Sequence, residues 1–230
     1  MANDQRPTTN DLLLCYITDR SAFGADEPTR RRRLLDKIAE ATHAGVDYIQ
    51  LREKDLSTRE LEYLAREAVG LMNELRAETQ ELQTALLINS RTDVARAVGA
   101  AGVHLRSNDI SPMEVKQIWT SFVGLSRREP LIGVSCHSPA EVAHAEAQGA
   151  TFAVFAPVFE KKDAPGTKPT GLVQLREACK AKIPVLALGG VTLENAKSCL
   201  DAGAGGIAGI RLFQDNHVAA IVERLRQLSR

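Results

Sequence analysis

The sequence predicts an α/β protein with a (β/α)8 TIM barrel, built as one domain over residues 1–230. Short apolar runs alternate with longer amphipathic segments along the chain. There are eight such pairs, which is the number of strand–helix units in this barrel. Glycines stand where several amphipathic segments give way to the next apolar run. A doubly wound open sheet is the alternative, but its usual glycine-rich fingerprint is replaced here by Ile17-Thr18-Asp19-Arg20.

The apolar runs predict buried parallel strands. They are rich in Val, Ile, Leu or Tyr and too continuously apolar to leave one face in water. In chain order the predicted strands are residues 12–17, 48–51, 85–88, 102–105, 131–134, 152–155, 184–188 and 206–210.

The segments between these strands have the apolar spacing of helices. Ser57, Ser138 and Thr192 stand before three of them as capping residues. The predicted helices are residues 31–44, 58–77, 92–98, 112–119, 139–148, 172–181, 193–202 and 217–228.

The composition excludes several classes of protein. Lys plus Arg and Asp plus Glu each number 29, so no net charge favours nucleic acid or a membrane surface as a partner. No apolar run reaches the roughly 20 residues of a membrane helix, and residues 1–10 form a polar N-terminal extension without the core of a signal peptide. The four cysteines and five histidines suggest neither a disulfide framework nor a zinc site. We expect a cytoplasmic protein.

In a TIM barrel, polar residues at the carboxyl ends of the strands face the active site. Gln50, Arg52 and Lys54 alternate after the second strand and therefore share one face. Two cations and an amide on that face favour an anionic ligand, because their desolvation would otherwise be costly. The alternative is a surface strip paired with Glu53 and Asp55.

Further polar residues follow the next three strands. Asn89 ends the third strand, and Asp109 follows the fourth as a candidate Mg²⁺ ligand or, alternatively, a turn or capping residue. Ser135 and His137 follow the fifth strand, where His137 is either an acid–base group or a structural histidine.

Glycines at the last two strands predict a phosphate site. Gly189 and Gly190 follow the seventh strand, and Gly209, Ile210 and Arg211 follow the eighth. The loops after these strands commonly bind phosphate in this fold, so a small phosphorylated substrate is expected. The loop 159–170, with Lys168, is either a flap that closes over phosphate or an exposed connection.

These motifs, in this order, resemble the thiamine phosphate synthase/TenI superfamily almost from end to end. The segments that carry the resemblance are Tyr16-Ile17-Thr18-Asp19, Tyr48-Ile49-Gln50-Leu51-Arg52-Glu53-Lys54, Gly102-Val103-His104-Leu105, Gly133-Val134-Ser135-Cys136-His137-Ser138, Pro157-Val158-Phe159, Pro184-Val185-Leu186-Ala187-Leu188-Gly189-Gly190, Asn195-Ala196 and Ile207-Ala208-Gly209-Ile210.

The resemblance implies a barrel of thiamin biosynthesis that binds thiazole phosphate near Gly190, Gly209 and Ile210. In the synthase branch, residues matching Gln50, Arg52, Lys54 and Asn89 hold the pyrimidine pyrophosphate, with Mg²⁺ at the carboxylate matching Asp109. Pyrophosphate then leaves, and the thiazole nitrogen captures the pyrimidine cation. The resemblance also implies a homodimer, because members of the family often form dimers.

The chain departs from the synthase pattern at several positions. Asn89-Ser90 stands where synthases usually read Asn-Asp, and Arg106-Ser107 replaces Gly-Gln before the aspartate. Thr167-Lys168 is out of register with the usual flap, and Arg211 replaces a serine.

Three alternatives to the synthase follow from these residues. A TenI-type thiazole tautomerase needs neither metal nor pyrophosphate and uses one imidazole, for which His137 is the matching residue. A non-catalytic barrel that binds thiazole phosphate would bind without turnover. An unrelated sugar phosphate isomerase would need a carboxylate base, and Asp109 is the best-placed position.

Overall fold

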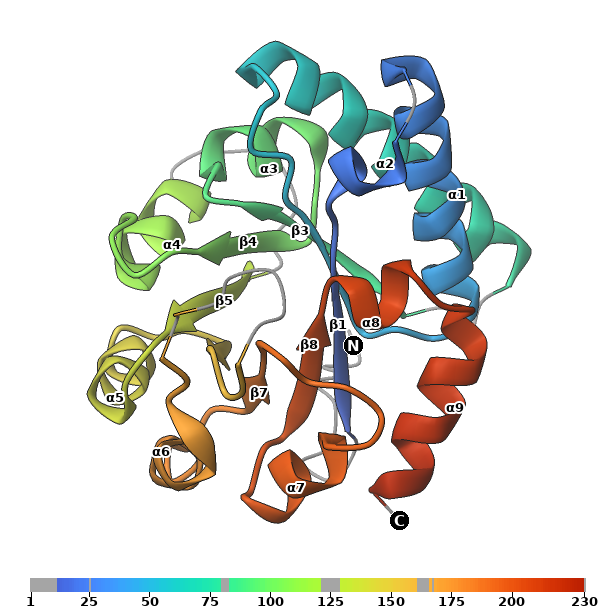
Figure 1. The fold of residues 1–230 in the computed structure, drawn as a ribbon. Helices are drawn as coiled ribbons and strands as arrows, with labels where there is room; N and C mark the ends of the chain where they lie inside the picture. Colours follow the sequence, from blue (N-terminus) through green and yellow to red (C-terminus); the bar gives the residue numbers. More distant parts are fainter. Residues whose placement is uncertain are drawn as a thin grey trace.

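Eight parallel strands close into a barrel in the computed structural model, which describes residues 12–24, 26–79, 83–120, 129–160, 166 and 168–229. Neighbouring strands pair in chain order, and the last pairs with the first (Figure 1). The strands are β1 (Leu13–Ile17), β2 (Tyr48–Leu51), β3 (Ala85–Asn89), β4 (Gly102–Leu105), β5 (Leu131–Cys136), β6 (Phe152–Phe155), β7 (Val185–Ala187) and β8 (Gly206–Gly209). The predicted TIM barrel is confirmed, whereas the predicted extension at residues 1–10 lies outside the described residues.

The helices surround the barrel on its outside (Figure 1). They are η1 (Arg20–Phe23), α1 (Glu27–His43), α2 (Thr58–Glu78), α3 (Thr92–Val98), α4 (Pro112–Thr120), α5 (Pro139–Ala147), α6 (Gly171–Ala178), α7 (Ala196–Asp201), α8 (Arg211–Gln214) and α9 (Val218–Leu228). No helix in the described ranges is long and apolar enough to cross a bilayer.

The helix boundaries differ from the prediction where capping residues were missed. Helix α1 begins at Glu27 rather than at residue 31, because the Asp26 side chain accepts a hydrogen bond from the Thr29 N–H at 2.8 Å. Helix α7 begins at Ala196 rather than at residue 193, because the Asn195 side chain accepts from the Thr192 N–H and forms a turn there. The short helices η1 and α8 carry too few apolar residues for their spacing to predict them.

An apolar layer fills the inside of the barrel below the candidate site. The rings of Tyr48 and Phe152 stack there with centroids 4.7 Å apart. Because side chains alternate along a strand, Gln50 shares the inward face of β2 with Tyr48 and lies one step nearer the carboxyl end. Polar side chains at the level of Gln50 therefore lie directly above a packed apolar layer.

Candidate active site

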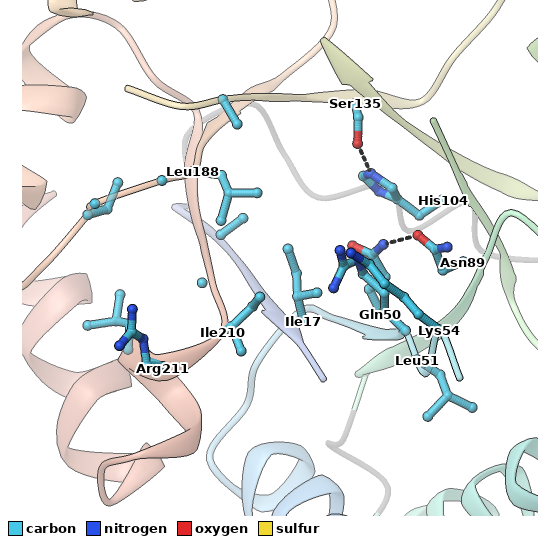
Figure 2. A pocket seen from close by; sticks show the side chains of 18 of the residues that line it. Ile17, Gln50, Leu51, Lys54, Asn89, His104, Ser135, Leu188, Ile210 and Arg211 are labelled. Atoms are coloured by element: carbon cyan, nitrogen blue, oxygen red, sulfur yellow. Dashed lines mark hydrogen bonds between the residues drawn. The ribbon is translucent and has the colours of Figure 1, made fainter. Parts of the chain in front are cut away.

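A cleft of about 1270 Å³ opens at the carboxyl ends of the strands. Ten of the residues around it are labelled in Figure 2. Of the residues predicted for the site, the cleft is lined by Gln50, Arg52, Lys54, Asn89, Ser135, His137, Gly189, Gly190, Gly209, Ile210 and Arg211. Most of the predicted site residues therefore lie around one cleft, as expected for residues that follow the strands of a barrel.

Two amides join β2 to β3 in the floor of the cleft. The Gln50 Nε2 donates to Asn89 Oδ1 at 2.7 Å, and Asn89 Nδ2 donates to Ser90 Oγ at 3.1 Å (Figure 2). Gln50 is only 2% exposed, yet its Oε1 has no hydrogen-bond partner among the residues that the structure describes. A buried acceptor left open at the edge of a cleft is suited to a donor on a bound ligand.

His104 and Ser135 form a second polar pair beside these amides. The His104 Nε2 lies 2.9 Å from Ser135 Oγ (Figure 2). The buried Nδ1 has no hydrogen-bond partner in the described part of the chain. Gly133 provides the room for this ring, because a Cβ there would lie 2.7 Å from the Nδ1. Burial and the charge of Arg52 lower the pKa of His104 to about 4, so the imidazole is neutral at pH 7.

Arg52 and Lys54 bring positive charge to the same side of the cleft. Burial lowers the pKa of Arg52, which nevertheless stays charged. The Arg52 guanidinium makes no hydrogen bond or ion pair with any residue that the structure describes. Lys54 is exposed and lines the same cleft (Figure 2). A desolvated cation without a partner favours a bound anion.

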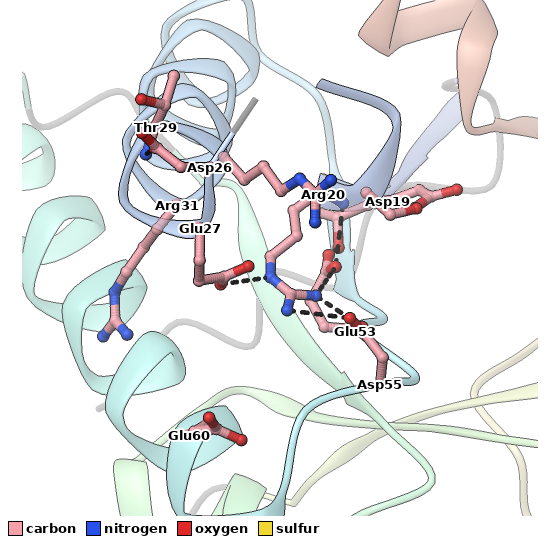
Figure 3. A network of polar contacts seen from close by, with 12 residues as sticks. Asp19, Arg20, Asp26, Glu27, Thr29, Arg31, Glu53, Asp55 and Glu60 are labelled. Atoms are coloured by element: carbon pink, nitrogen blue, oxygen red, sulfur yellow. Dashed lines mark hydrogen bonds and ion pairs between the residues drawn. The ribbon is translucent and has the colours of Figure 1, made fainter. Parts of the chain in front are cut away.

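A buried network fixes the backbone that carries Arg52. The Thr18 hydroxyl donates to Glu53 Oε1 at 2.5 Å and accepts from the Arg52 N–H at 3.0 Å. Arg20 contacts Glu53 Oε2 through its backbone N–H and its guanidinium, and also pairs with Asp55 at 2.7 Å (Figure 3). Burial raises the pKa of Glu53, although the hydrogen bonds from Thr18 and Arg20 oppose the shift.

This network corrects one alternative reading of the β2 end. Glu53 and Asp55 pair with Arg20 rather than forming a surface strip with Arg52 and Lys54. Sequence reasoning missed Thr18 and Arg20 as positioning residues, and the signal was present: Thr18-Asp19-Arg20 follows a wholly apolar strand.

The far side of the cleft is built from backbone. Gly189 and Gly190 have φ values of +92° and +65°, which glycine adopts at low cost. A Cβ at Gly190 would lie 2.5 Å from the Glu160 carbonyl oxygen, so only glycine fits. Among the described residues the N–H groups of Gly190 and Ile210 have no backbone acceptor. They are suited to an anion, with Arg211 beside them (Figure 2).

His137 lies at the cleft edge, where its ring is fixed by one hydrogen bond. Its Nδ1 lies 2.7 Å from the Ala156 carbonyl oxygen. Because that oxygen can only accept, the Nδ1 carries the proton and Nε2 keeps a lone pair. His137 can therefore act as a base through Nε2.

The arrangement around Asp109 does not fit Mg²⁺ as it stands. Arg106 occupies both carboxylate oxygens through its backbone N–H and its guanidinium. Burial acts in the opposite direction, but hydrogen bonds from Ser90 and Arg106 hold the pKa of Asp109 below its usual value. The described residues contain no group of three or more His, Cys, Asp or Glu side chains that could hold a metal. The carboxylate closes the turn that begins at Arg106, and its assignment as a Mg²⁺ ligand stays a prediction.

Of the predicted flap at residues 159–170, Glu160 lines the cleft. Lys168 is exposed and does not line the cleft. Residues 161–165 and 167 lie outside the described part of the chain, so the expectation that the loop closes over phosphate stays a prediction.

His104 is the main residue of the candidate site that the strand-end pattern does not identify. It lies inside the apolar strand β4, and the apolar pattern that predicts this strand assigns no role to a histidine within it. The unusual feature was a titratable side chain on the inward face of a parallel barrel, next to the carboxyl end.

Comparison with known proteins identifies the family. A sequence profile of thiamine monophosphate synthases matches residues 14–213. A putative thiamine-phosphate synthase 2 from Aquifex aeolicus is 40% identical over 201 residues, which cover 87% of this chain and 96% of that protein. The thiamine-phosphate synthase of Syntrophomonas wolfei is 36% identical over 224 residues, covering 95% and 97%.

A solved structure gives the same result. The thiamine phosphate pyrophosphorylase of Pyrococcus furiosus superposes with a TM-score of 0.74 at 31% identity, and 96% of each chain is covered. The profile, the relatives and the shared fold all agree with the resemblance found in the strand-end motifs. The chain therefore belongs to the thiamine monophosphate synthase family.

Proposed function

We propose that the protein is a thiamine-phosphate synthase, which joins hydroxymethylpyrimidine pyrophosphate to thiazole phosphate and releases pyrophosphate. One observation supports this above the others: a single cleft has two separate regions whose groups are suited to anions. Arg52 and Lys54 lie at the β2 side, and the Gly190 and Ile210 N–H groups lie at the β7 and β8 side. The two regions suit a pyrophosphate and a phosphate held at the same time.

The floor between these regions is suited to the pyrimidine ring. Gln50 Oε1 and His104 Nδ1 are buried polar atoms that no described residue pairs with, and both residues line the cleft. A ring with polar edge atoms would satisfy them, whereas an apolar ligand would leave them unsatisfied. The apolar side chains of Ile17, Leu188 and Ile210 also line the cleft and suit the faces of an aromatic ring (Figure 2).

The proposed reaction requires electrostatic stabilisation rather than proton transfer. The bond between the pyrimidine methylene carbon and the pyrophosphate oxygen breaks, and the electron pair leaves with the oxygen. The thiazole nitrogen then donates its lone pair to the methylene carbon. Arg52 and Lys54 stabilise the charge that develops on the leaving group. Neutral His104 avoids placing a second positive charge beside the pyrimidine cation.

Thiamine-phosphate synthases generally depend on Mg²⁺. Because Arg106 occupies both oxygens of Asp109, none of these steps is assigned to a metal at that residue. Small phosphorylated substrates follow from the proposed reaction, whereas a cytoplasmic location and a homodimer stay predictions.

A thiazole tautomerase is the second candidate, and His137 is the observation that favours it. Its fixed ring and the lone pair on Nε2 are what a proton transfer would use. This reaction would use the phosphate region around Gly190 but would leave Arg52 without a function in the chemistry.

Product formation separates the two candidates. Purified protein is incubated with both synthase substrates, with and without Mg²⁺, and thiamin phosphate and pyrophosphate are measured. A parallel assay follows aromatisation of carboxythiazole phosphate. We expect Arg52→Ala to lower the synthase rate about 100-fold and to affect tautomerisation little, and His137→Ala to do the reverse.

Arg66→Ala is the matched control, because this exposed arginine pairs with Glu62 on the outer helix α2. It should leave both activities unchanged. A folded protein that forms no thiamin phosphate under any of these conditions refutes the synthase.

A further inference from the structure

The guanidinium of Arg106 lies where the family resemblance places a metal ion. Its Nε and Nη2 donate to Asp109 Oδ1 at 3.2 and 3.0 Å, and its backbone N–H donates to Asp109 Oδ2 at 2.8 Å. The Asp109 side chain is only 11% exposed, whereas that of Arg106 is 61% exposed. Arg106 lines the same cleft as Arg52 and Lys54. Asp109 thus positions a positive charge at the side of the cleft suited to pyrophosphate.

The second position next to Asp109 is neutral. Ser90 hydrogen-bonds to Asp109 and also accepts from Asn89, so its hydroxyl is part of a chain of contacts that reaches Gln50. Ser90 has a φ of +59°, and its N–H donates to the His104 carbonyl oxygen at 2.8 Å, which fixes this conformation. A divalent ion here would find one carboxylate, and it would have to displace the Arg106 guanidinium to reach it.

We propose that Arg106 takes the place of the divalent cation, so that this protein binds pyrophosphate directly through Arg106, Arg52 and Lys54. The inference rests on the proposed synthase function. A guanidinium presents several N–H donors in one plane and forms paired hydrogen bonds with phosphate oxygens. Because its charge is permanent, it needs no proton transfer, and its attraction for the leaving oxygen strengthens as negative charge develops there.

The step balances without a metal or a protein acid. The electron pair of the broken C–O bond stays on the pyrophosphate oxygen, and the thiazole nitrogen supplies the pair of the new C–N bond. Arg106, Arg52 and Lys54 only stabilise the released charge. Asp109 is a positioning residue in this scheme and touches no substrate atom.

The test measures binding of inorganic pyrophosphate by calorimetry, in excess EDTA and in Mg²⁺. We expect the wild type to bind in EDTA. Arg106→Ala should weaken that binding by about 10- to 100-fold and make it depend on Mg²⁺, because Asp109 is then free to hold a metal. Arg66→Ala, which removes an exposed paired arginine remote from the cleft, should bind like the wild type.

Asp109→Asn distinguishes positioning from metal ligation. If Asp109 positions Arg106, the variant keeps most of its pyrophosphate binding in EDTA, since the guanidinium and its charge are still present. If Asp109 holds a metal, binding occurs only in Mg²⁺ and the variant loses it. Wild-type protein that binds pyrophosphate only with Mg²⁺, with Arg106→Ala unchanged, overturns the proposal.

The proposal and the synthase function fail in different ways. Thiamin phosphate formed only in the presence of Mg²⁺ supports the synthase and overturns the role of Arg106. Pyrophosphate bound in EDTA by a folded protein that forms no product supports the direct anion site and refutes the synthase.

Discussion

The buried imidazole of His104 makes the stability of the barrel sensitive to acid. It is 2% exposed, its Nε2 is paired only with Ser135, and its Nδ1 has no partner. Burial and Arg52 lower its pKa to about 4 in the folded protein, against about 6.5 in an unfolded chain. The unfolded state therefore binds more protons between these two values, and folding is weakened as the pH falls through that window.

The size of the effect follows from these two pKa values. Between about pH 7 and pH 5 the imidazole should lower the free energy of unfolding by about 2 kcal/mol, and by about 3 kcal/mol when pH 4 is reached. Protonation of carboxylates that are paired in the folded protein also lowers the free energy of unfolding in acid. The contribution of His104 must therefore be obtained as the difference between the wild type and a variant that lacks this histidine.

Urea denaturation at several pH values, followed by circular dichroism, measures this difference. The wild type is compared with His104→Asn, which removes the titration and keeps a polar side chain. We expect the stability gap between the two proteins to narrow by about 2 kcal/mol from about pH 7 to pH 5. His43→Asn, at the exposed end of α1, leaves His104 in place and should follow the wild-type pH dependence. Parallel curves for the wild type and His104→Asn would refute the reasoning.

Three further substitutions test the packing around the cleft. Thr18→Val leaves the buried Glu53 Oε1 without its donor and the part-buried Arg52 N–H without its acceptor, and should cost about 3 kcal/mol. The melting temperature should fall by about 6–12 °C, whereas Thr18→Ser keeps the hydroxyl; equal melting temperatures for Thr18→Val and the wild type would contradict this. Gly190→Ala should abolish binding of inorganic phosphate in calorimetry, because its Cβ would meet the Glu160 carbonyl; unchanged affinity would disprove the backbone site. Gly133→Ala places a Cβ against the His104 and Phe152 rings and should cost about 1–3 kcal/mol in urea denaturation, and wild-type stability would argue against this packing.

The fold could be predicted because the residues of each strand match the environment that surrounds it. A parallel strand with helices outside and neighbours inside is buried on both faces, so runs such as residues 12–17 and 152–155 contain almost no polar residue. The ends of the helices were predicted less accurately than the strands. The side chains of Asp26 and Asn195 decide where α1 and α7 begin, and their hydrogen bonds depend on backbone geometry that the sequence alone does not show.

Residues of the candidate site could be predicted where their position at the end of a strand alone places them at the mouth of the barrel. Gln50, Asn89 and Ser135 follow strands directly, and their inward side chains must meet at one end of the barrel. Pairings among charged residues were not predictable. Whether Asp109 turns toward Arg106 or stays open to a metal depends on the conformation of one short turn, which spacing does not determine.

The two sides of the cleft differ in how freely they can change during evolution. The phosphate side depends on backbone N–H groups and on the absence of a Cβ at Gly190, so almost any substitution there removes the site. The pyrophosphate side depends on side-chain charge at separate positions, and one cation can be exchanged for another while the strands stay in place. Ser90 and Arg106 lie on that second side. On the proposal made for Arg106, a guanidinium can take the place of a metal without disturbing the thiazole phosphate site, so relatives that share this exchange are expected to pair an arginine at the position of Arg106 with a residue other than a carboxylate at the position of Ser90.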